Sequence, residues 1–454
     1  MRRSGFAQTQ RFAQRVLNVL RCAPRLSGSH HAKKRLSLTQ IVVATSIGNV
    51  LEWYDIFVFA SFAVFIAKSF FPMASETASM LLTFGSFGAS YLVRPLGGMI
   101  IGAYEVRRGR RSALLLTVGL MVVGTAIIAL IPSYSKIGLV APVGIFAARL
   151  IQGFSAGGEF GASTAMLIEQ TPLRSGFLSS WQFATQGLAL LLASLFGFVL
   201  TGFATPAELA SWGWRVPFFF GLLIGPVGLY LRRFVEDGPV YLKAEHTRTP
   251  IRDVFRRQKS MLLVSIGALT LSTAVNHLLQ YVPTFAMREL HLAASTGFAA
   301  SALAGAVLTI VTPFAGHLSD RIGRLKQMSW AAVLCLITGY PTFAYVVSHV
   351  SILALFALVG WLALLNAIYF GPLAALMAES FPVSTRATGM SIAYNVGVTA
   401  FGGFTPAIVI WLISVTGSKA APSYYLMFTA VVSLAALAAI SKVRLASHKA
   451  SVVA

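Results

Sequence analysis

The sequence has few charged residues and few cysteines, and both shortages narrow the class of protein. Charged residues make up 11% of the 454 residues, whereas a soluble globular chain carries about 25%. The two cysteines, Cys22 and Cys335, cannot form the disulfide framework that staples small secreted domains. We therefore exclude an ordinary soluble domain and a disulfide-rich secreted protein.

The motifs of common enzyme classes are also missing. Neither H-E-x-x-H nor G-x-x-x-x-G-K-[ST] occurs in the chain, so metalloprotease and P-loop chemistry lack their residues. No serine–histidine–acid set is evident, although a triad assembled in space cannot be read from sequence order. We expect no catalytic residue, no metal ligand and no cofactor.

Long apolar runs dominate what is present. Hydrophobic residues make up 56% of the chain, and its mean hydropathy is +0.74. A run of about 20 apolar residues can cross the hydrocarbon core of a bilayer as a helix. The sequence predicts an all-α integral membrane protein with twelve such helices, which begin near Ile41, Ala78, Ser112, Val140, Phe177, Trp212, Met261, Thr296, Met328, Ile352, Ala387 and Tyr424.

The net charge of +22 follows the predicted topology. With the amino terminus in the cytoplasm, 29 of the 36 lysines and arginines fall on the inner side and 5 on the outer side, as the positive-inside rule requires. We therefore expect both termini in the cytoplasm, the lipid bilayer as a partner, and no nucleic acid. The basic first 38 residues resemble a transit peptide in composition, but a cytoplasmic extension or an early start codon is favoured.

Two pairs of similar stretches divide the chain into halves. The stretch "GAYEVRRGRR" at 102–111 matches "GHLSDRIGRL" at 316–325, which lies 214 residues later. Likewise, "EQTPLRSG" at 169–176 matches "ESFPVSTRATG" at 379–389. Such repeats are typical of secondary transporters and favour alternating access over a fixed channel or a sensor. We predict a basic extension (1–38), a six-helix bundle (39–232), a cytoplasmic loop (233–260), a second bundle (261–443) and a short tail (444–454).

The duplicated loop resembles that of the major facilitator superfamily. The stretches "GNVLEWYD", "RPLGG", "RLIQGFSAGGEFG" and "WGWRVPFFFGLLIGPVGLYLRR" resemble its metabolite:proton symporter family. "LIPSYSKIGLVAP", "SSWQFATQG" and "FGGFTPAIVIWLI" are most similar to the citrate/tricarballylate type. The resemblance covers about residues 37–443. It implies two pseudo-symmetric six-helix bundles with a substrate site between them at the membrane midplane.

The resemblance also implies a function. We expect a monomeric symporter in the bacterial inner membrane that carries a small organic acid with protons as the coupling ion. The alternative is a proton symporter of a zwitterion such as betaine or proline, or of another monocarboxylate metabolite. Osmosensory members of that branch have a long carboxyl-terminal coiled coil, and its absence here favours an organic acid. The sequence does not give the particular acid, the proton stoichiometry or the direction of transport.

The duplicated loops and the acids before the matching turns are the candidate gates. Glycines permit the tight turns, and arginines can bridge to neighbouring helix ends. The family Asp before the first Arg of the loop is kept as Asp320, but the first half has Val106 there. Either Glu105 substitutes for that Asp or the lock in the first half is weaker. The candidate gating residues are Gly102, Glu105, Arg107, Gly109, Arg110, Glu169, Gly316, Asp320, Arg321, Gly323, Arg324 and Glu379. Of these, Glu169 and Glu379 are expected to pair with loop arginines such as Arg107 or Arg321.

Two acids in the first predicted span are the candidate proton site. Glu52 and Asp55 are three residues apart, so their Cβ atoms lie about 5–6 Å apart on one helical face. Two carboxylates that close in a membrane interior are not expected to be ionised together. The alternative is that one of them pairs with Arg149 or caps a neighbouring backbone. Glu159 is a further candidate for proton coupling.

Polar residues in the other spans are candidates for substrate binding. Arg149 and Gln152 share a face; the guanidinium could bind a substrate carboxylate or form a permanent ion pair with Glu52, Asp55 or Glu159. Asn49 and the glycines 153, 157, 158 and 161 are expected to pack helices, and Arg94 is expected to snorkel or to brace the adjacent loop. His277 could donate to an anion or bond a backbone carbonyl. The remaining candidates either pack helices or line a central cavity: Gln182, Gln186, Asn276, Gln280, Asn366, Tyr369 and Asn395.

Overall fold

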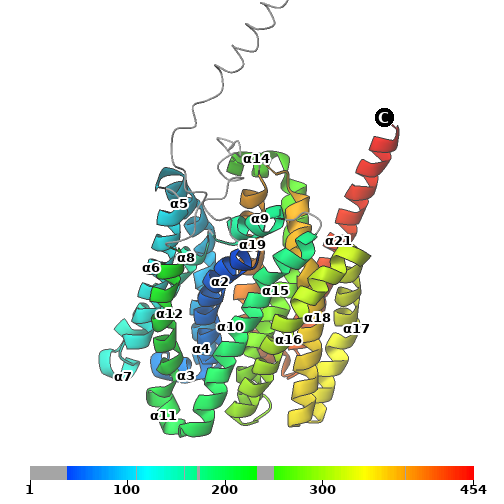
Figure 1. Ribbon diagram of the computed structural model, residues 1–454. Coiled ribbons are helices and arrows are strands. Elements are labelled where there is room, and N and C mark those ends of the chain that lie inside the picture. Colours follow the sequence, from blue (N-terminus) through cyan, green and yellow to red (C-terminus); the bar gives the residue numbers. More distant parts are fainter. Residues whose placement is uncertain are drawn as a thin grey trace, which may run out of the picture. The chain divides into compact units, whose positions relative to one another are not determined.

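The helices of the first half follow the predicted spans (Figure 1). The computed structural model describes residues 38–453, except 109, 158, 171–173, 233–249 and 384, and every regular element in this part of the chain is helical. The first-half elements are α2 (Leu38–Ser61), α3 (Ala63–Phe70), α4 (Glu76–Leu92), α5 (Arg94–Arg108), α6 (Arg110–Leu130), α7 (Tyr134–Ile137), α8 (Val140–Ala156), α9 (Glu159–Gln170), α10 (Ser175–Phe203), α11 (Pro206–Ser211), η2 (Gly213–Arg215) and α12 (Val216–Arg232).

The second half consists mostly of long, uninterrupted helices. Its elements are α14 (Pro250–Arg257), α15 (Lys259–Arg288), α16 (Ala294–Ile322), α17 (Arg324–Ser348), α18 (Ile352–Ser380), α19 (Arg386–Val398), η3 (Thr399–Gly403), α20 (Thr405–Thr416) and α21 (Pro422–Val453). The five-residue element η3 is a turn of π-helix inside the eleventh span. Such turns are frequent at functional sites.

The helices fill all twelve predicted membrane spans. Among the described residues, seven helices are long and apolar enough to cross a bilayer, and the pair Glu52–Ser61 and Ala63–Phe70, bent by 70°, makes an eighth. Spans two, three, four and six are built by shorter or interrupted helices: α4 with α5, α6, α8 with α9, and α12. The fold is therefore an all-α membrane protein of two pseudo-symmetric six-helix bundles, as predicted. Most of the interruptions fall in the first half, and in the second half η3 interrupts the eleventh span.

The two halves meet along two seams. In the unit Gln40–Ala454, α10 runs beside α16 (Figure 1), and α4 packs against α20 and η3. The first seam joins spans five and eight and the second joins spans two and eleven, so the repeat symmetry exchanges them. Backbone contact is close at the first seam: a Cβ atom on Gly187 would lie 2.7 Å from the Cβ atom of Leu308.

Glycines also allow the interrupted helices to touch. Added Cβ atoms on Gly153 and Gly157 would collide with the backbone oxygens of Ser90 and Arg94, and one on Gly161 would collide with that of Ala387. The predicted close-packing role of these three glycines is confirmed. The contacts bring α8 against the break between α4 and α5, where Pro95 cannot donate a backbone hydrogen bond. Polar side chains near this break are therefore held in the interior of the bundle.

The predicted domain boundaries stay predictions. The loop proposed for residues 233–260 contains α14, and the rest of it up to Pro250 lies outside the described residues. The predicted end of the second bundle, near residue 443, lies inside the continuous helix α21.

Candidate functional site

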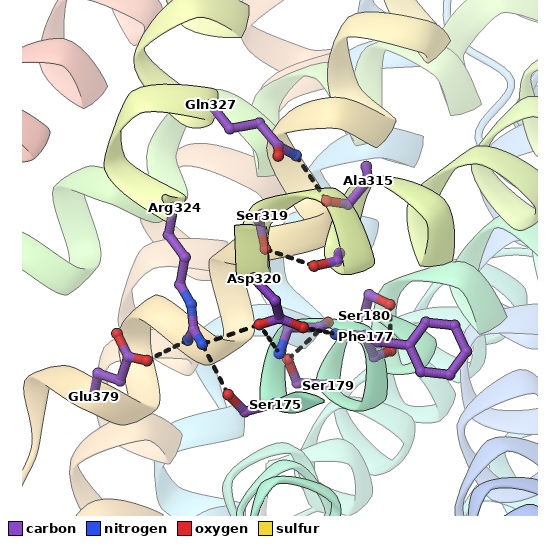
Figure 2. Close-up of polar contacts among 12 residues, drawn as sticks. Ser175, Phe177, Ser179, Ser180, Ala315, Ser319, Asp320, Arg324, Gln327 and Glu379 are labelled. Atoms are coloured by element: carbon purple, nitrogen blue, oxygen red, sulfur yellow. Dashed lines mark hydrogen bonds and ion pairs between the residues drawn. The ribbon is translucent and has the colours of Figure 1, made fainter. Parts of the chain in front are cut away.

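Asp320 caps the start of a helix from the other half of the chain. Its carboxylate accepts hydrogen bonds from the backbone N–H groups of Gly176 (3.0 Å) and Phe177 (3.2 Å), in the first turn of α10. Figure 2 shows this carboxylate between α16 and α10. The first N–H groups of a helix have no partner within the helix, and this end carries a partial positive charge. A carboxylate placed here therefore stabilises the contact between the halves.

Arg324, the first residue of α17, extends this contact to α18. Its guanidinium lies 3.3 Å from Asp320 and 2.6 Å from the carboxylate of Glu379 on α18, and it donates to the hydroxyl of Ser175 at 2.8 Å (Figure 2). We call Ser175, Gly176, Phe177, Asp320, Arg324 and Glu379 the inner cluster, because the charge pattern predicts that this end faces the cytoplasm. The cluster joins the two halves by charge-assisted hydrogen bonds.

The structure corrects one detail of the predicted gate. Arg324, rather than Arg321, is the ion-pair partner of Glu379, while Arg321 is exposed. Gly323 adopts φ +94°, a conformation that favours glycine. Gly316 lies so close to α10 that an added Cβ would be 2.5 Å from the carbonyl oxygen of Gly176. The predicted tight turn and close approach are therefore confirmed in the second half.

The corresponding loop of the first half is only partly described. Gly102 has open space around it. The side chains of Glu105, Arg107, Arg110 and Glu169, and the whole of Gly109, lie outside the described residues. Whether Glu105 replaces the missing Asp therefore stays a prediction.

Asp55 belongs to a buried chain of polar side chains in the first half. The Thr125 hydroxyl donates a short hydrogen bond to Oδ2 of Asp55, Gln152 Nε2 donates to Thr125 Oγ1 (3.0 Å), and Arg149 Nη1 donates to Gln152 Oε1 (2.8 Å). We call these four residues the Asp55 chain. Arg149 therefore reaches the acid through two neutral side chains, and no direct ion pair joins them in the described structure.

The Arg149 guanidinium keeps unused donors. The side chain is fully buried, and its Nε and Nη2 atoms have no hydrogen-bond partner in the described protein. Its Cζ atom lies 4.4 Å from the ring centre of Phe59 and 5.1 Å from that of Phe87. Aromatic faces offer a weak electrostatic attraction to a cation. Two donors thus remain for an anion.

Glu52 is less buried than Asp55. Asp55 is 4% exposed and accepts the hydrogen bond from Thr125, whereas Glu52, one turn earlier on the same helix, is half-buried. The side chain of Glu159 lies outside the described residues.

A second polar chain crosses the boundary between the halves. Asn276 Nδ2 donates to Gln186 Oε1 at 3.2 Å, and Gln186 Nε2 donates to the Tyr394 hydroxyl at 3.1 Å. Gln280 Nε2 donates to the backbone oxygen of Asn276 at 3.2 Å. The Tyr394 ring stacks on Phe160, with ring centres 3.6 Å apart. We call Gln186, Asn276 and Gln280 the amide row.

His277 also reaches across the boundary. Its Nδ1 faces the carbonyl of Thr273 (2.7 Å), and its Nε2 lies 3.0 Å from the Tyr91 hydroxyl. A ring nitrogen that faces a carbonyl must carry the proton, so Nε2 of the neutral ring accepts from Tyr91. The predicted alternative in which His277 bonds a backbone carbonyl is thus the one present.

Arg94 is a central residue that the sequence pattern misplaced. The side chain is 1% exposed, and its guanidinium lies 4.1 Å from the Tyr91 ring centre and 5.4 Å from that of Trp53. Its Nε atom has no hydrogen-bond partner in the described protein. The snorkelling prediction is therefore wrong, because the break before α5 turns the side chain inward. A charged residue beside a proline in an apolar span was the available signal.

The other predicted binding residues do not join one cluster. Gln182 bonds Ser163 and Asn49 within the first half, which confirms the packing role of Asn49. Tyr369 donates to the backbone of Ala268 (2.7 Å), and neither amide atom of Asn366 has a hydrogen-bond partner among the described residues. Asn395 crosses the boundary, but it donates to a backbone oxygen, that of Gly157 (2.7 Å).

An outer contact was absent from the sequence prediction. At the opposite end from the inner cluster, Arg288 of α15 lies 3.6 Å from Glu76 and donates to Thr77 at 3.3 Å, both at the start of α4. Glu76 is 63% exposed, so this ion pair is screened by solvent. The halves are therefore joined at both ends.

Comparisons with known proteins agree with this architecture. Residues 45–404 match the family model of the Major Facilitator Superfamily. The chain is 38% identical over 400 residues to a citrate-proton symporter of Klebsiella pneumoniae, covering 87% of this chain and 90% of the relative. It is 31% identical over 421 residues to a proline/betaine transporter of Escherichia coli (strain K12), covering 87% and 82%. A solved D-xylose-proton symporter shares the fold, with a TM-score of 0.71 at 18% identity over 87% of this chain and 96% of that one.

Proposed function

The chain belongs to the Major Facilitator Superfamily, and we propose that it carries a small organic acid anion together with protons across the bacterial inner membrane. The substrate class is citrate or another di- or tricarboxylate. Transport proceeds by alternating access, in which the two halves open the central site first to one side and then to the other. Both termini lie in the cytoplasm, and the carrier works as a monomer.

The observation that supports this substrate class is the pair of buried arginines. Arg94 and Arg149 are buried, and both keep N–H groups without a partner in the described protein. An uncompensated buried cation is costly. A carboxylate offsets that cost, because it accepts the hydrogen bonds of the guanidinium group and balances its charge. A substrate with two or three carboxylates suits two guanidinium groups. The relatives named as citrate-proton symporters support the same choice.

Arg94 is the more direct binding residue. It lies at the ring of Tyr91, whose hydroxyl bonds His277 from the second half. A substrate that binds Arg94 therefore contacts residues of both halves, and its binding can bias their relative movement. Arg149 binds a second carboxylate through its unused Nε and Nη2 donors, and through Gln152 and Thr125 it is also linked to Asp55.

Asp55 and Glu52 divide the proton chemistry. Asp55 is buried in the first half, where the proton it holds changes the charge next to Arg149. Glu52, one turn earlier on the same helix, is half-buried and takes up protons from the open side. A half-loaded carrier, with substrate but without the proton, would close around an unbalanced charge, which is costly in a membrane interior. Coupling follows from this cost.

The gates act at the two ends. The inner cluster holds α10 against α16 and must separate before the site opens inward. The outer contact between Arg288 and Glu76 must separate before the site opens outward. The inner contact is better shielded, since Asp320 and Arg324 are 11% and 12% exposed whereas Glu76 is 63% exposed.

The test is uptake of labelled citrate into proteoliposomes with an imposed inward proton gradient. Wild-type protein should accumulate citrate, and a protonophore should abolish the accumulation. Arg94→Gln should raise the citrate concentration for half-maximal uptake by at least about tenfold, the cost of one lost charge-assisted interaction. Arg215→Gln is the matched control, because Arg215 also lies over an aromatic ring, that of Trp214 (4.2 Å), but near the outer end of the bundle.

Two results would overturn the proposal. Uptake of citrate that ignores the gradient would remove proton coupling. Accumulation of betaine or proline, with no competition by any di- or tricarboxylate, would replace the organic acid by a zwitterion, as the relatives named as proline/betaine transporters would suggest.

A further inference from the structure

The seventh span presents two buried amides to the other half of the chain. Asn276 and Gln280 of α15 are four residues apart, so they lie on one face of the helix. They are 2% and 0% exposed. The bond from Asn276 to Gln186 places this face against α10.

The hydrogen bonds of these amides leave acceptors without partners. The NH2 group of Gln280 bonds the backbone oxygen of Asn276, an assignment fixed by chemistry because only the NH2 end can donate to a carbonyl. The NH2 group of Asn276 bonds Gln186, whose own NH2 group bonds Tyr394. Oε1 of Gln280 and Oδ1 of Asn276 have no partner in the described protein.

The unpaired buried acceptors indicate that the substrate supplies a hydrogen-bond donor. A carbonyl oxygen that loses water and gains no donor costs free energy. An ionised carboxylate cannot supply the donor, because it only accepts, and a quaternary ammonium group has no N–H. A hydroxyl group can donate. The first half offers the opposite chemistry, since Arg94 and Arg149 have unused donors.

We propose that Gln280, assisted by Asn276, binds the hydroxyl group of the substrate and selects 2-hydroxy acids over acids with the same carboxylates and no hydroxyl. The inference rests on the proposed function, because it assumes that an organic acid is carried. Carboxylates bind the arginines of the first half, and the hydroxyl group binds the amides of the second. One molecule then connects both halves, and a molecule without the hydroxyl leaves Gln280 unpaired.

Loss of a substrate hydroxyl has a different cost in a polar site and in an apolar pocket. A site built to bind a substrate hydroxyl strongly rejects an analogue that lacks it, because the buried polar group is then left without a partner. An apolar pocket would discriminate far less between the same two molecules.

The test compares citrate with propane-1,2,3-tricarboxylate, which has the same three carboxylates and no hydroxyl. Inhibition of labelled citrate counterflow by each unlabelled acid gives two apparent affinities, and uptake of each labelled acid is measured directly. We expect wild-type protein to bind citrate at least about tenfold more tightly. In Gln280→Met, citrate binding should weaken by at least about tenfold while binding of the hydroxyl-free acid changes less than about twofold.

The matched control is Gln327→Met. Gln327 of α17 is buried, bonds two backbone carbonyls (of Ala315 and Ile368) and also has an unpaired Oε1, but its contacts lie within the second half. This variant should change both affinities alike, if at all.

The outcomes separate the inference from the function on which it rests. Equal affinities of wild-type protein for the two acids would overturn the inference and leave organic acid transport standing, and this comparison needs no variant. Gln280→Met weakening both acids equally would also overturn it. Transport of neither acid, or of betaine in their place, would overturn the proposed function together with the inference.

Discussion

Removal of the Asp320 carboxylate should open the inner end of the transporter. In the closed state this carboxylate accepts two backbone N–H groups of α10 and contacts Arg324. In an inward-open state the same carboxylate would be hydrated. Asp320→Ala therefore removes an interaction that exists only in the closed state.

The size of the effect follows from the geometry. The Asp320 carboxylate accepts hydrogen bonds as a charged group and lies at the start of a helix, and its side chain is only 11% exposed. Together these interactions stabilise the closed state by about 2–4 kcal/mol. A loss of that size shifts the balance between closed and open states by about 30- to 700-fold. We do not add a separate contribution for Glu379, because that side chain is 42% exposed.

The assay is the accessibility of a cysteine placed behind the inner cluster. Ser180 is buried beside Gly316, so Ser180→Cys, in a background without Cys22 and Cys335, should react slowly with a membrane-impermeant maleimide. Asp320→Ala should raise the rate from the inner side by at least about tenfold, because labelling follows the open population. Asp253→Ala, which removes a half-buried acid of α14 outside the cluster, is the control. Labelling within about twofold of the parent rate in Asp320→Ala would refute the account of the inner cluster.

Three further predictions concern other parts of the molecule. Thr125→Val breaks the link between Asp55 and Gln152 and should lower gradient-driven uptake by at least about tenfold while counterflow persists. The control is Thr201→Val, because the Thr201 hydroxyl bonds only its own helix; this variant should leave gradient-driven uptake and counterflow unchanged. Gly153→Ala should destabilise the fold by about 1–3 kcal/mol in thermal unfolding, since its Cβ would collide with Ser90, and Gly85→Ala, with open space around it, should not. Glu76→Gln breaks an exposed ion pair worth about 0–1 kcal/mol. The labelling rate of a cysteine at the outer end should therefore change less in Glu76→Gln than the rate at the inner end changes in Asp320→Ala. A larger change at the outer end would contradict the conclusion that the inner contact is the stronger one.

The helices and the second-half gate could be predicted because their signals are local. Each apolar run lies within one stretch of sequence, and the turn at Gly323 depends on the residue in that turn. The duplicated loops pointed to the place where Asp320 and Arg324 meet α10, although not to the pairing of Arg324 with Glu379. That pairing depends on which turn of α16 and α17 faces α18, and helical periodicity does not give it.

The candidate site was harder to predict because it depends on how helices face one another. Glu52 and Asp55 share a face by periodicity, yet Asp55 is buried against Thr125 and Glu52 is only half-buried. Arg94 was expected to snorkel or to brace the adjacent loop because it lies near a predicted helix end, and the break before Pro95 turns it inward. Gln182 is an amide like the members of the amide row, but it bonds within its own half, as the Tyr369 hydroxyl does. The pair of Arg288 and Glu76 joins residues far apart in sequence that no motif connects.

The central claim is that a buried acid couples protons to the substrate, and Asp55→Asn tests it most directly. Two rates are measured in the same proteoliposomes: uptake of labelled citrate driven by a proton gradient, and exchange of internal for external citrate without a gradient. The account predicts that gradient-driven uptake is lost while exchange persists, because the loaded carrier can still reorient. Full gradient-driven uptake by Asp55→Asn would contradict it and would make Asp55 a structural residue.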